Sequence, residues 1–205
     1  MPLRPMFRSA LFSATLAFAP LHAFATATVD QPAPAFTATT ADGKTISLDS
    51  LKGKTVVLEW TNHDCPFVKK HYDSGNMQSL QKDATAKGVV WLQVISSAPG
   101  KQGYVDGATA MKLNSARSAV PTATLLDPDG KLGKLYEAKT TPHMYIIDAK
   151  GVLVYKGGID SIASSDKADI AKAEPYVTEA LSSLAAGKKV TANNTKPYGC
   201  SVKYE

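Results

Sequence analysis

Cysteine is scarce in this sequence, because only two of its 205 residues are cysteines, Cys65 and Cys200. Two cysteines are far too few for a scaffold that depends on a dense disulfide framework. The fold must therefore be built around an ordinary hydrophobic core, and the 44% of hydrophobic and 20% of charged residues are typical of a globular domain that has one. The two cysteines form either one structural disulfide or one redox couple.

Long apolar segments are also lacking. The apolar run at residues 10–19 follows a basic start, is broken by Pro20 and leads to Ala23-Phe24-Ala25. This pattern is typical of a secretory signal peptide and is too short for a membrane span. We expect cleavage after Ala25, with Ala27 as the alternative. The sequence thus predicts a periplasmic or secreted protein with no stable membrane insertion once residues 1–25 are removed.

Arginine is nearly absent after this leader, where Arg117 is the only one. The formal net charge is +5, and loss of the two leader arginines lowers it to +3. The lysines are scattered, and pairs such as Lys69-Lys70 and Lys188-Lys189 are typical of solvated faces rather than of a stripe that binds nucleic acid. We therefore expect no nucleic-acid partner.

Short apolar segments alternate with helical segments along the rest of the chain. The expected strands are 36–40, 45–48, 55–60, 89–95, 122–126, 143–147 and 152–155, and the expected helices are 66–86, 103–117 and 166–186, the last bent or interrupted at Pro175. This alternation predicts one α/β domain over residues 26–186, with helices on both faces of a mostly parallel sheet and an antiparallel edge. Residues 187–205 form a polar tail that carries Cys200.

Cys65 stands between an expected strand and an expected helix. At the start of a helix, unpaired backbone N–H groups and the helix dipole stabilise a thiolate. Pro66 suits the first helical turn, where its missing N–H costs nothing. A thiolate attacks disulfides and peroxides, so we expect an ionised, accessible sulfur at this position. The alternative is an inert, half-buried cysteine, against which the polar residues Asn62-His63-Asp64 argue.

Glu59 lies six residues before Cys65, inside an otherwise apolar strand. A carboxyl buried there would have a raised pKa and could move a proton to or from a thiol. The alternative is a glutamate at an edge of the sheet that faces solvent.

The dipeptide Thr141-Pro142 precedes a strand, where proline is tolerated because it cannot donate to the ladder. A cis bond at this step would expose the Thr141 backbone, which could then pair with an extended substrate. His143 would lie close to the sulfur in that arrangement. A surface turn is the alternative.

Taken together, these motifs resemble the thioredoxin-like superfamily, and within it the redoxin group of AhpC/TSA-like and peroxiredoxin-like proteins. Cys65-Pro66 opening the first helix and Thr141-Pro142 before a late strand carry the resemblance, which spans about residues 32–186. It implies a three-layer α/β sandwich with a mixed central sheet flanked by helices, and it implies thiol chemistry. Glu59 matches the position of the buried acid of thioredoxins.

The sequence departs from these families at three places. Val68 stands where thioredoxins carry the second cysteine of Cys-x-x-Cys, His63 replaces their usual tryptophan, and Asn62 replaces the peroxiredoxin threonine. The nearby resolving thiol is therefore missing. Cys200 could instead act as a distant resolving cysteine. The alternative is a permanent staple to Cys65, which would stabilise the fold by about 4–5 kcal/mol on the loop-entropy account. We favour the redox couple.

The leading hypothesis is an exported thiol–disulfide oxidoreductase that needs no cofactor and that could reduce hydroperoxides. Cys65 would attack, Glu59 or His63 would manage protons, and Cys200 would resolve. Thr141, Pro142 and His143 would bind the substrate. The partners would be protein thiols or disulfides, or hydroperoxides, together with an external thiol reductant. Redoxin relatives often dimerise, which makes a homodimer one alternative for the assembly.

Two other functions compete with this hypothesis. Cys65, His63 and His143 offer a thiolate and two imidazoles, a set that suits Cu(I) or Zn(II) in a metal-binding module of the cell envelope. The third alternative is a binding module without catalysis, for which Cys65→Ser would change nothing in a thiol-exchange assay.

Overall fold

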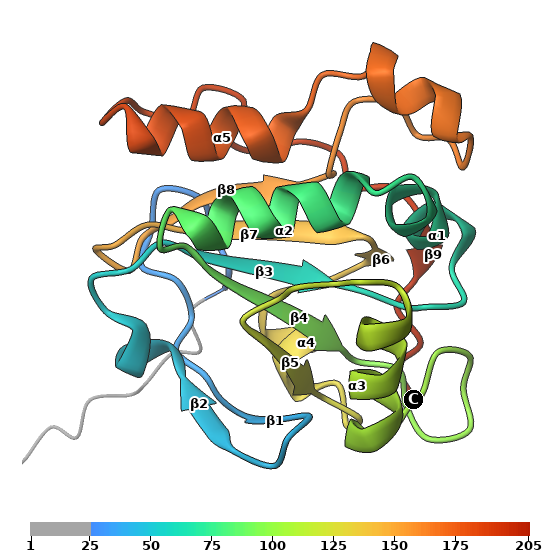
Figure 1. Ribbon diagram of the computed structural model, residues 1–205. Coiled ribbons are helices and arrows are strands. Elements are labelled where there is room, and N and C mark those ends of the chain that lie inside the picture. Colours follow the sequence, from blue (N-terminus) through green and yellow to red (C-terminus); the bar gives the residue numbers. More distant parts are fainter. Residues whose placement is uncertain (1–25) are drawn as a thin grey trace, which may run out of the picture.

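The structure is a computed structural model, and it describes residues 26–205, so the expected signal peptide lies outside the described residues. Nine strands are present in that part of the chain (Figure 1). Their bounds are β1 Thr37–Thr40, β2 Thr45–Ser47, β3 Val56–Trp60, β4 Val90–Ile95, β5 Ala123–Leu126, β6 Thr140–Thr141, β7 His143–Ile147, β8 Leu153–Gly157 and β9 Cys200–Ser201.

Seven of the strands form one mixed sheet in the order β2-β1-β5-β4-β3-β7-β8. Strand β4, at the centre of the sheet, runs parallel to both β3 and β5, whereas all other neighbouring strands are antiparallel. The mixed sheet implied by the family resemblance is confirmed. The expectation of a mostly parallel sheet is wrong, because the hairpins β1–β2 and β7–β8 each join the sheet through a strand that runs against its neighbour.

Helices account for most of the remaining chain. They are α1 Pro66–Asp73, α2 Asn76–Ala86, α3 Gly107–Ala116, α4 Lys131–Leu135 and α5 Tyr176–Ala185, with 3-10 helices η1 Leu48–Leu51 and η2 Lys167–Lys172. The single helix expected over 66–86 is interrupted at Gly75, whose φ of 78° an α-helix does not accommodate. The helix expected from residue 103 begins later, because the Asp106 side chain caps its first turn. The expected interruption at Pro175 is confirmed.

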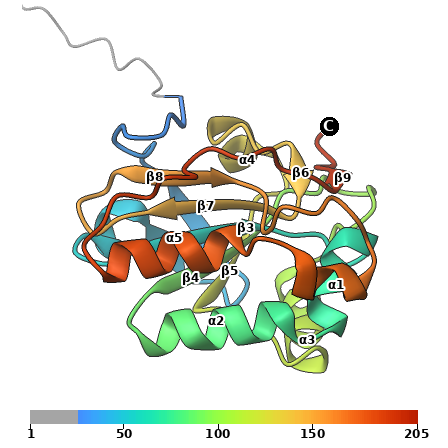
Figure 2. The same ribbon diagram turned by 90° about the horizontal axis from the view of Figure 1, so that it is seen from above.

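Two apolar clusters fill the two spaces beside the sheet. In one cluster, side chains on one face of β3, β4, β7 and β8 pack against α1, α2 and α5. In the other, side chains on the opposite face of these strands pack against η1 and the segment around α4. Figures 1 and 2 show α2 and α5 side by side on one face of the sheet. Trp60, Trp91 and Tyr145 are fully buried between the layers. The three-layer α/β sandwich is thus the observed fold.

The tail returns across the domain to the end of the sheet where β3 leads into α1. Within the tail, β9 lies beside β6 (Figure 2) and pairs with it antiparallel. In this pairing Thr141 is opposite Cys200. Beyond this strand, Val202 donates its N–H to the Lys139 carbonyl at 3.1 Å, and the Ala98 N–H donates to the Lys203 carbonyl at 2.8 Å. The tail is therefore part of the fold. No helix within residues 26–205 is both long and apolar enough to cross a membrane.

Candidate active site

Cys65 occupies the N-cap position of α1, directly after the turn that follows β3. The Asn62 side chain holds this turn, because its Oδ1 accepts a hydrogen bond of 2.9 Å from the Asp64 N–H. The Asn62 carbonyl accepts a second bond, 3.1 Å long, from the Cys65 N–H. Pro66 is the first residue of the helix, as the sequence predicts. The local sequence therefore places the sulfur at the helix start.

The sulfur of Cys65 meets two groups that lie far away in the sequence. Its Sγ is 2.7 Å from the Sγ of Cys200 and 3.1 Å from the carbonyl oxygen of Thr141. Both cysteines are free thiols. The spacing of the sulfurs leaves only a small movement to the roughly 2.05 Å of a disulfide bond. The structure thus brings together the two cysteines that the sequence places 135 residues apart.

The Thr141–Pro142 peptide bond is cis, in agreement with the sequence-based expectation. The Thr141 backbone does pair with an extended segment, and that segment is the chain's own β9. The approach is close at Gly199, where a Cβ would lie 2.0 Å from the Thr141 carbonyl oxygen. Its φ of 130° also lies in the region that favours glycine. Gly199 is therefore required for the contact between the tail and Thr141.

The pKa of the Cys65 thiol is lowered even though burial alone would raise it. Hydrogen bonds from the Cys200 thiol, the Val68 and Cys200 backbone and the Thr141 side chain outweigh the loss of solvent. The pKa of Cys200 is raised to about 11, because that thiol is partly buried and faces the Cys65 sulfur. The first proton of the pair therefore leaves the Cys65 side, and Cys200 remains the thiol that donates to it.

This difference predicts two separate titrations. In protein labelled with ¹³C at cysteine Cβ, the Cys65 signal is expected to shift at a lower pH than that of free cysteine, and the Cys200 signal near pH 11. A lower pKa means a larger thiolate fraction at neutral pH. The Cys200→Ala variant removes one donor to the thiolate and should raise the Cys65 midpoint. Two thiols that both titrate above free cysteine would contradict the assignment.

The expectation that the sulfur is accessible is wrong for this state of the molecule, because Cys65 is 0% exposed. The tail covers it, with Cys200 against the sulfur and β9 along Thr141. The helix-start position could be predicted from neighbouring residues. The burial of the sulfur could not be predicted, because the segment that covers it lies more than 130 residues away in the sequence.

Glu59 is fully buried in β3, which confirms the buried alternative. Its carboxylate accepts hydrogen bonds from Tyr72 at 2.7 Å, Trp91 at 2.8 Å and Gln81 at 3.1 Å. Burial raises the pKa of Glu59, and the nearby Arg117 cation together with these donors opposes the rise. The hydrogen bonds lead to α1, α2 and β4, so contact with the Cys65 sulfur is not part of this network.

The polar contacts of the two histidines of the predicted site are made with residues other than the two cysteines. His63 is partly exposed, and its Nε2 is 3.4 Å from the Asp64 carboxylate. His143 is buried, and its Nδ1 faces the Lys139 N–H at 3.3 Å and the Tyr145 hydroxyl at 3.1 Å. Burial lowers the pKa of His143 to about 3, and the nearby lysines act in the same direction.

The metal-binding alternative required Cys65, His63 and His143 to converge. Over residues 26–205, no three His, Cys, Asp or Glu side chains lie together in a way that could hold a metal ion. The structure therefore gives this alternative no ligand set.

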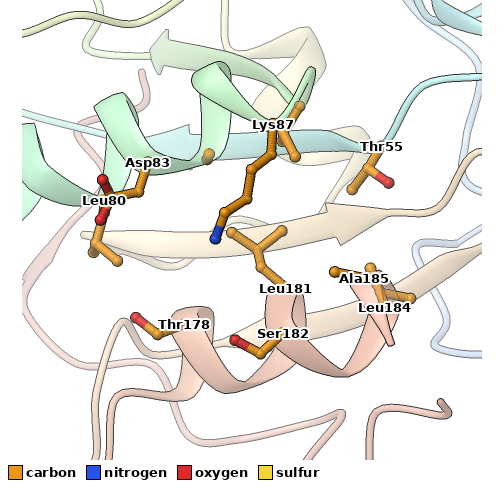
Figure 3. Close-up of a pocket in the computed structure, with 11 residues that line it drawn as sticks. Thr55, Leu80, Asp83, Lys87, Thr178, Leu181, Ser182, Leu184 and Ala185 are labelled. Atoms are coloured by element: carbon orange, nitrogen blue, oxygen red, sulfur yellow. The ribbon is translucent and has the colours of Figure 1, made fainter. Parts of the chain in front are cut away.

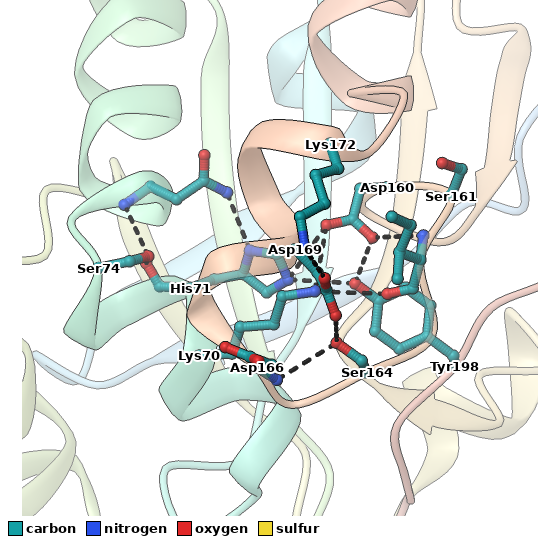
Figure 4. Close-up of polar contacts among 12 residues, drawn as sticks. Lys70, His71, Ser74, Asp160, Ser161, Ser164, Asp166, Asp169, Lys172 and Tyr198 are labelled. Atoms are coloured by element: carbon teal, nitrogen blue, oxygen red, sulfur yellow. Dashed lines mark hydrogen bonds and ion pairs between the residues drawn. The ribbon is translucent and has the colours of Figure 1, made fainter.

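A buried polar cluster beside the site is absent from the sequence-based prediction. It consists of Lys70, His71, Asp160 and Tyr198, which Figure 4 shows directed toward one another. The Lys70 Nζ is 3.6 Å from the Asp160 carboxylate. The Tyr198 hydroxyl donates a hydrogen bond of 2.6 Å to the same carboxylate. The expectation that Lys69-Lys70 is a solvated pair is wrong for Lys70, whose side chain is 0% exposed. The segment after β8 covers this lysine and supplies the carboxylate, a long-range pairing that charge spacing cannot reveal.

The apolar pocket in Figure 3 lies between α2 and α5 and is lined by residues such as Leu80, Leu181 and Leu184. Thr55, at the beginning of β3, also lines it, whereas Cys65 follows the end of that strand. The pocket is therefore at the other end of the sheet from the sulfur pair.

Comparison with solved structures shows that the fold is thioredoxin-like. An uncharacterized conserved protein of Geobacillus kaustophilus is 24% identical with a TM-score of 0.73, covering 87% of this chain and 93% of that chain. A hypothetical protein of Sinorhizobium meliloti 1021 is 20% identical with a TM-score of 0.72, covering 87% and 95%. The thioredoxin domain of a thiol-disulfide oxidoreductase from Bacteroides vulgatus is 20% identical with a TM-score of 0.50, covering 71% and 96%.

The AhpC/TSA family matches residues 29–156, which include Cys65, Thr141 and Pro142. The chain belongs to the AhpC/TSA family, as the sequence resemblance predicts. Cys200 and its tail lie outside the matched residues. No curated protein matches the sequence.

Proposed function

We propose that this chain is an exported thiol–disulfide oxidoreductase in which Cys65 attacks and Cys200 resolves. The observation that carries the proposal is the 2.7 Å approach of the two sulfurs at the start of α1. Membership of the AhpC/TSA family and the fold shared with a thiol-disulfide oxidoreductase of Bacteroides vulgatus support it. The signal-peptide pattern of residues 1–25 supports export.

The reaction proceeds by two thiol–disulfide exchanges. The Cys65 thiolate attacks one sulfur of a partner disulfide, forms a mixed disulfide and releases the other sulfur as a thiolate that takes up a proton. The Cys200 thiol then loses its proton and attacks Cys65 Sγ, which forms the Cys65–Cys200 disulfide and releases the second partner thiol. The partner gains two electrons, and an external thiol reductant restores the dithiol.

In this proposal Glu59 and His63 are the candidates for proton transfer. The raised pKa of Glu59 suits a group that gives or takes a proton, and His63 lies two residues before Cys65 with partial exposure. The proton-transfer roles of Glu59 and His63 stay predictions. Assembly into a homodimer also stays a prediction. A hydroperoxide would lead to the same disulfide. Cys65 would attack one peroxide oxygen, break the O–O bond and release an alcohol or water, and Cys200 would condense with the resulting sulfenic acid and release water.

Equilibration of the protein in glutathione buffers of graded potential tests the proposal. Mass spectrometry is expected to find one disulfide, between residues 65 and 200, that forms reversibly within the range of known dithiol oxidoreductases, roughly −120 to −270 mV. A potential below about −300 mV would show a structural staple instead. Separate addition of hydrogen peroxide and of a protein disulfide to the reduced chain then identifies which oxidant forms the bond faster.

A further inference from the structure

The tail excludes any partner from the sulfur in the state that the structure shows. Cys65 is 0% exposed, and β9 uses the Thr141 backbone that an extended polypeptide would need. A partner disulfide can therefore reach Cys65 only after the tail has moved away from Thr141. The tail also carries Cys200, the thiol that completes the reaction in the proposed function. One segment thus blocks the first step and performs the second.

The Tyr198 side chain anchors the tail directly before the glycine that leads into β9. Tyr198 is 8% exposed, and its ring packs edge-on against Phe67 of α1 with centroids 5.9 Å apart. Its hydroxyl donates to Asp160 at 2.6 Å and lies 3.2 Å from the His71 Nε2 (Figure 4). The Lys70 Nζ lies 5.6 Å from the centre of the ring. A hydrogen bond to a buried, charged carboxylate is stronger than one between neutral groups, so this anchor opposes release of the tail.

We propose that the tail and the polypeptide partner compete for the same Thr141 edge, so that a strand exchange couples resolution to product release. This inference rests on the proposed function. Displacement of β9 lets the partner pair with Thr141, and the Cys65 thiolate then attacks the partner's disulfide. This forms the mixed disulfide with one partner cysteine and breaks the partner's S–S bond, releasing its other sulfur as a thiol. The tail then returns, its Tyr198 docks again, and Cys200 attacks Cys65 Sγ. The released partner leaves as a thiol because the strand and the sulfur that held it have both been replaced.

The tail also indicates which polypeptide fits this edge. Gly199 precedes the cysteine, and a Cβ there would lie 2.0 Å from the Thr141 oxygen, so only glycine allows this approach. A phenol two residues before the cysteine reaches the Asp160 carboxylate. The partner is therefore an extended segment with glycine directly before its cysteine, and a tyrosine before the glycine strengthens binding.

A peptide with the sequence of residues 196–203 tests the inference, with its cysteine activated as a disulfide with nitrothiobenzoate. Attack on the peptide sulfur releases the coloured thiolate, the better leaving group, and mass spectrometry verifies the product. In a Cys200→Ser background, Tyr198→Phe is expected to speed formation of the mixed disulfide about tenfold, the factor that corresponds to about 1.4 kcal/mol. With Cys200 present, the same substitution should slow release of the peptide about tenfold.

Opposite effects on the two steps distinguish strand exchange from loosening of the fold. Tyr136→Phe is the matched control, because it removes a buried hydroxyl that donates to the Pro34 carbonyl at 2.7 Å and leaves the Tyr198 anchor intact. It should change neither rate by more than about twofold. Tyr198→Phe acting on both steps in the same direction, or on neither, would overturn the inference.

Two further results separate this inference from the proposed function. A peptide with alanine in place of its glycine should react at least tenfold more slowly, and equal rates would refute the stated partner chemistry. The full-length Cys200→Ser chain should form the mixed disulfide and should never release the peptide. If no variant forms any mixed disulfide, the proposed function itself fails.

Discussion

Cys65→Ser is expected to lower the rate of disulfide exchange by at least about a thousandfold, to the rate without protein. The serine hydroxyl is not ionised near neutral pH, so the attacking group is lost although the helix start and the tail keep their backbone contacts. The measurement is the reduction of a protein disulfide by the prereduced chain in a single turnover, with mass spectrometry of the products.

Cys200→Ser is the matched variant for this experiment. It keeps the nucleophile and removes only the resolving thiol, so it should react once and remain as a mixed disulfide on Cys65. The binding-module alternative requires that Cys65→Ser changes nothing. Equal rates for wild type and Cys65→Ser would therefore exclude the enzyme and leave only the architecture.

Asp160→Ala is expected to lower the free energy of unfolding by about 3–5 kcal/mol. The substitution leaves the Lys70 ammonium in a buried site where its remaining hydrogen bond is to the Ile162 carbonyl at 3.3 Å. It also removes the acceptor of the Tyr198 hydroxyl. An unpaired buried charge is costly because it has lost its solvation without gaining a counter-charge. Urea denaturation of the reduced protein, analysed as a two-state transition, measures the change.

A double-mutant cycle tests the cause of this loss. Lys70→Met in the Asp160→Ala background removes the stranded charge and should recover most of the stability. Asp49→Asn is the control, since its ion pair with Lys52 is exposed and should leave the free energy of unfolding nearly unchanged. If the two buried substitutions were simply additive, the charge pair would not be the reason for the loss.

The local parts of the site could be predicted from the sequence. Cys65-Pro66 after an apolar strand indicates a helix start, and the structure has Cys65 as the N-cap of α1. Thr141-Pro142 before a strand indicates the cis step that the structure contains. The sequence left open whether Glu59 is buried or faces solvent. A strand has two faces, and its sequence pattern does not show what covers each of them. Tyr72, Gln81 and Trp91, which cover this face, come from three different elements.

By itself, then, the sequence determined the α/β class, the position of Cys65 at a helix start and the presence of a distant second thiol. These features depend on contacts within a few residues, on hydrophobic periodicity and on residue chemistry. Only the tertiary structure decided that Cys200 lies against Cys65, that β9 occupies the Thr141 edge and that Lys70 is buried with Asp160. Each of these joins segments about 60 to 135 residues apart, and such pairings depend on how distant segments pack on the finished sheet. The same packing seals the sulfur that the local sequence activates.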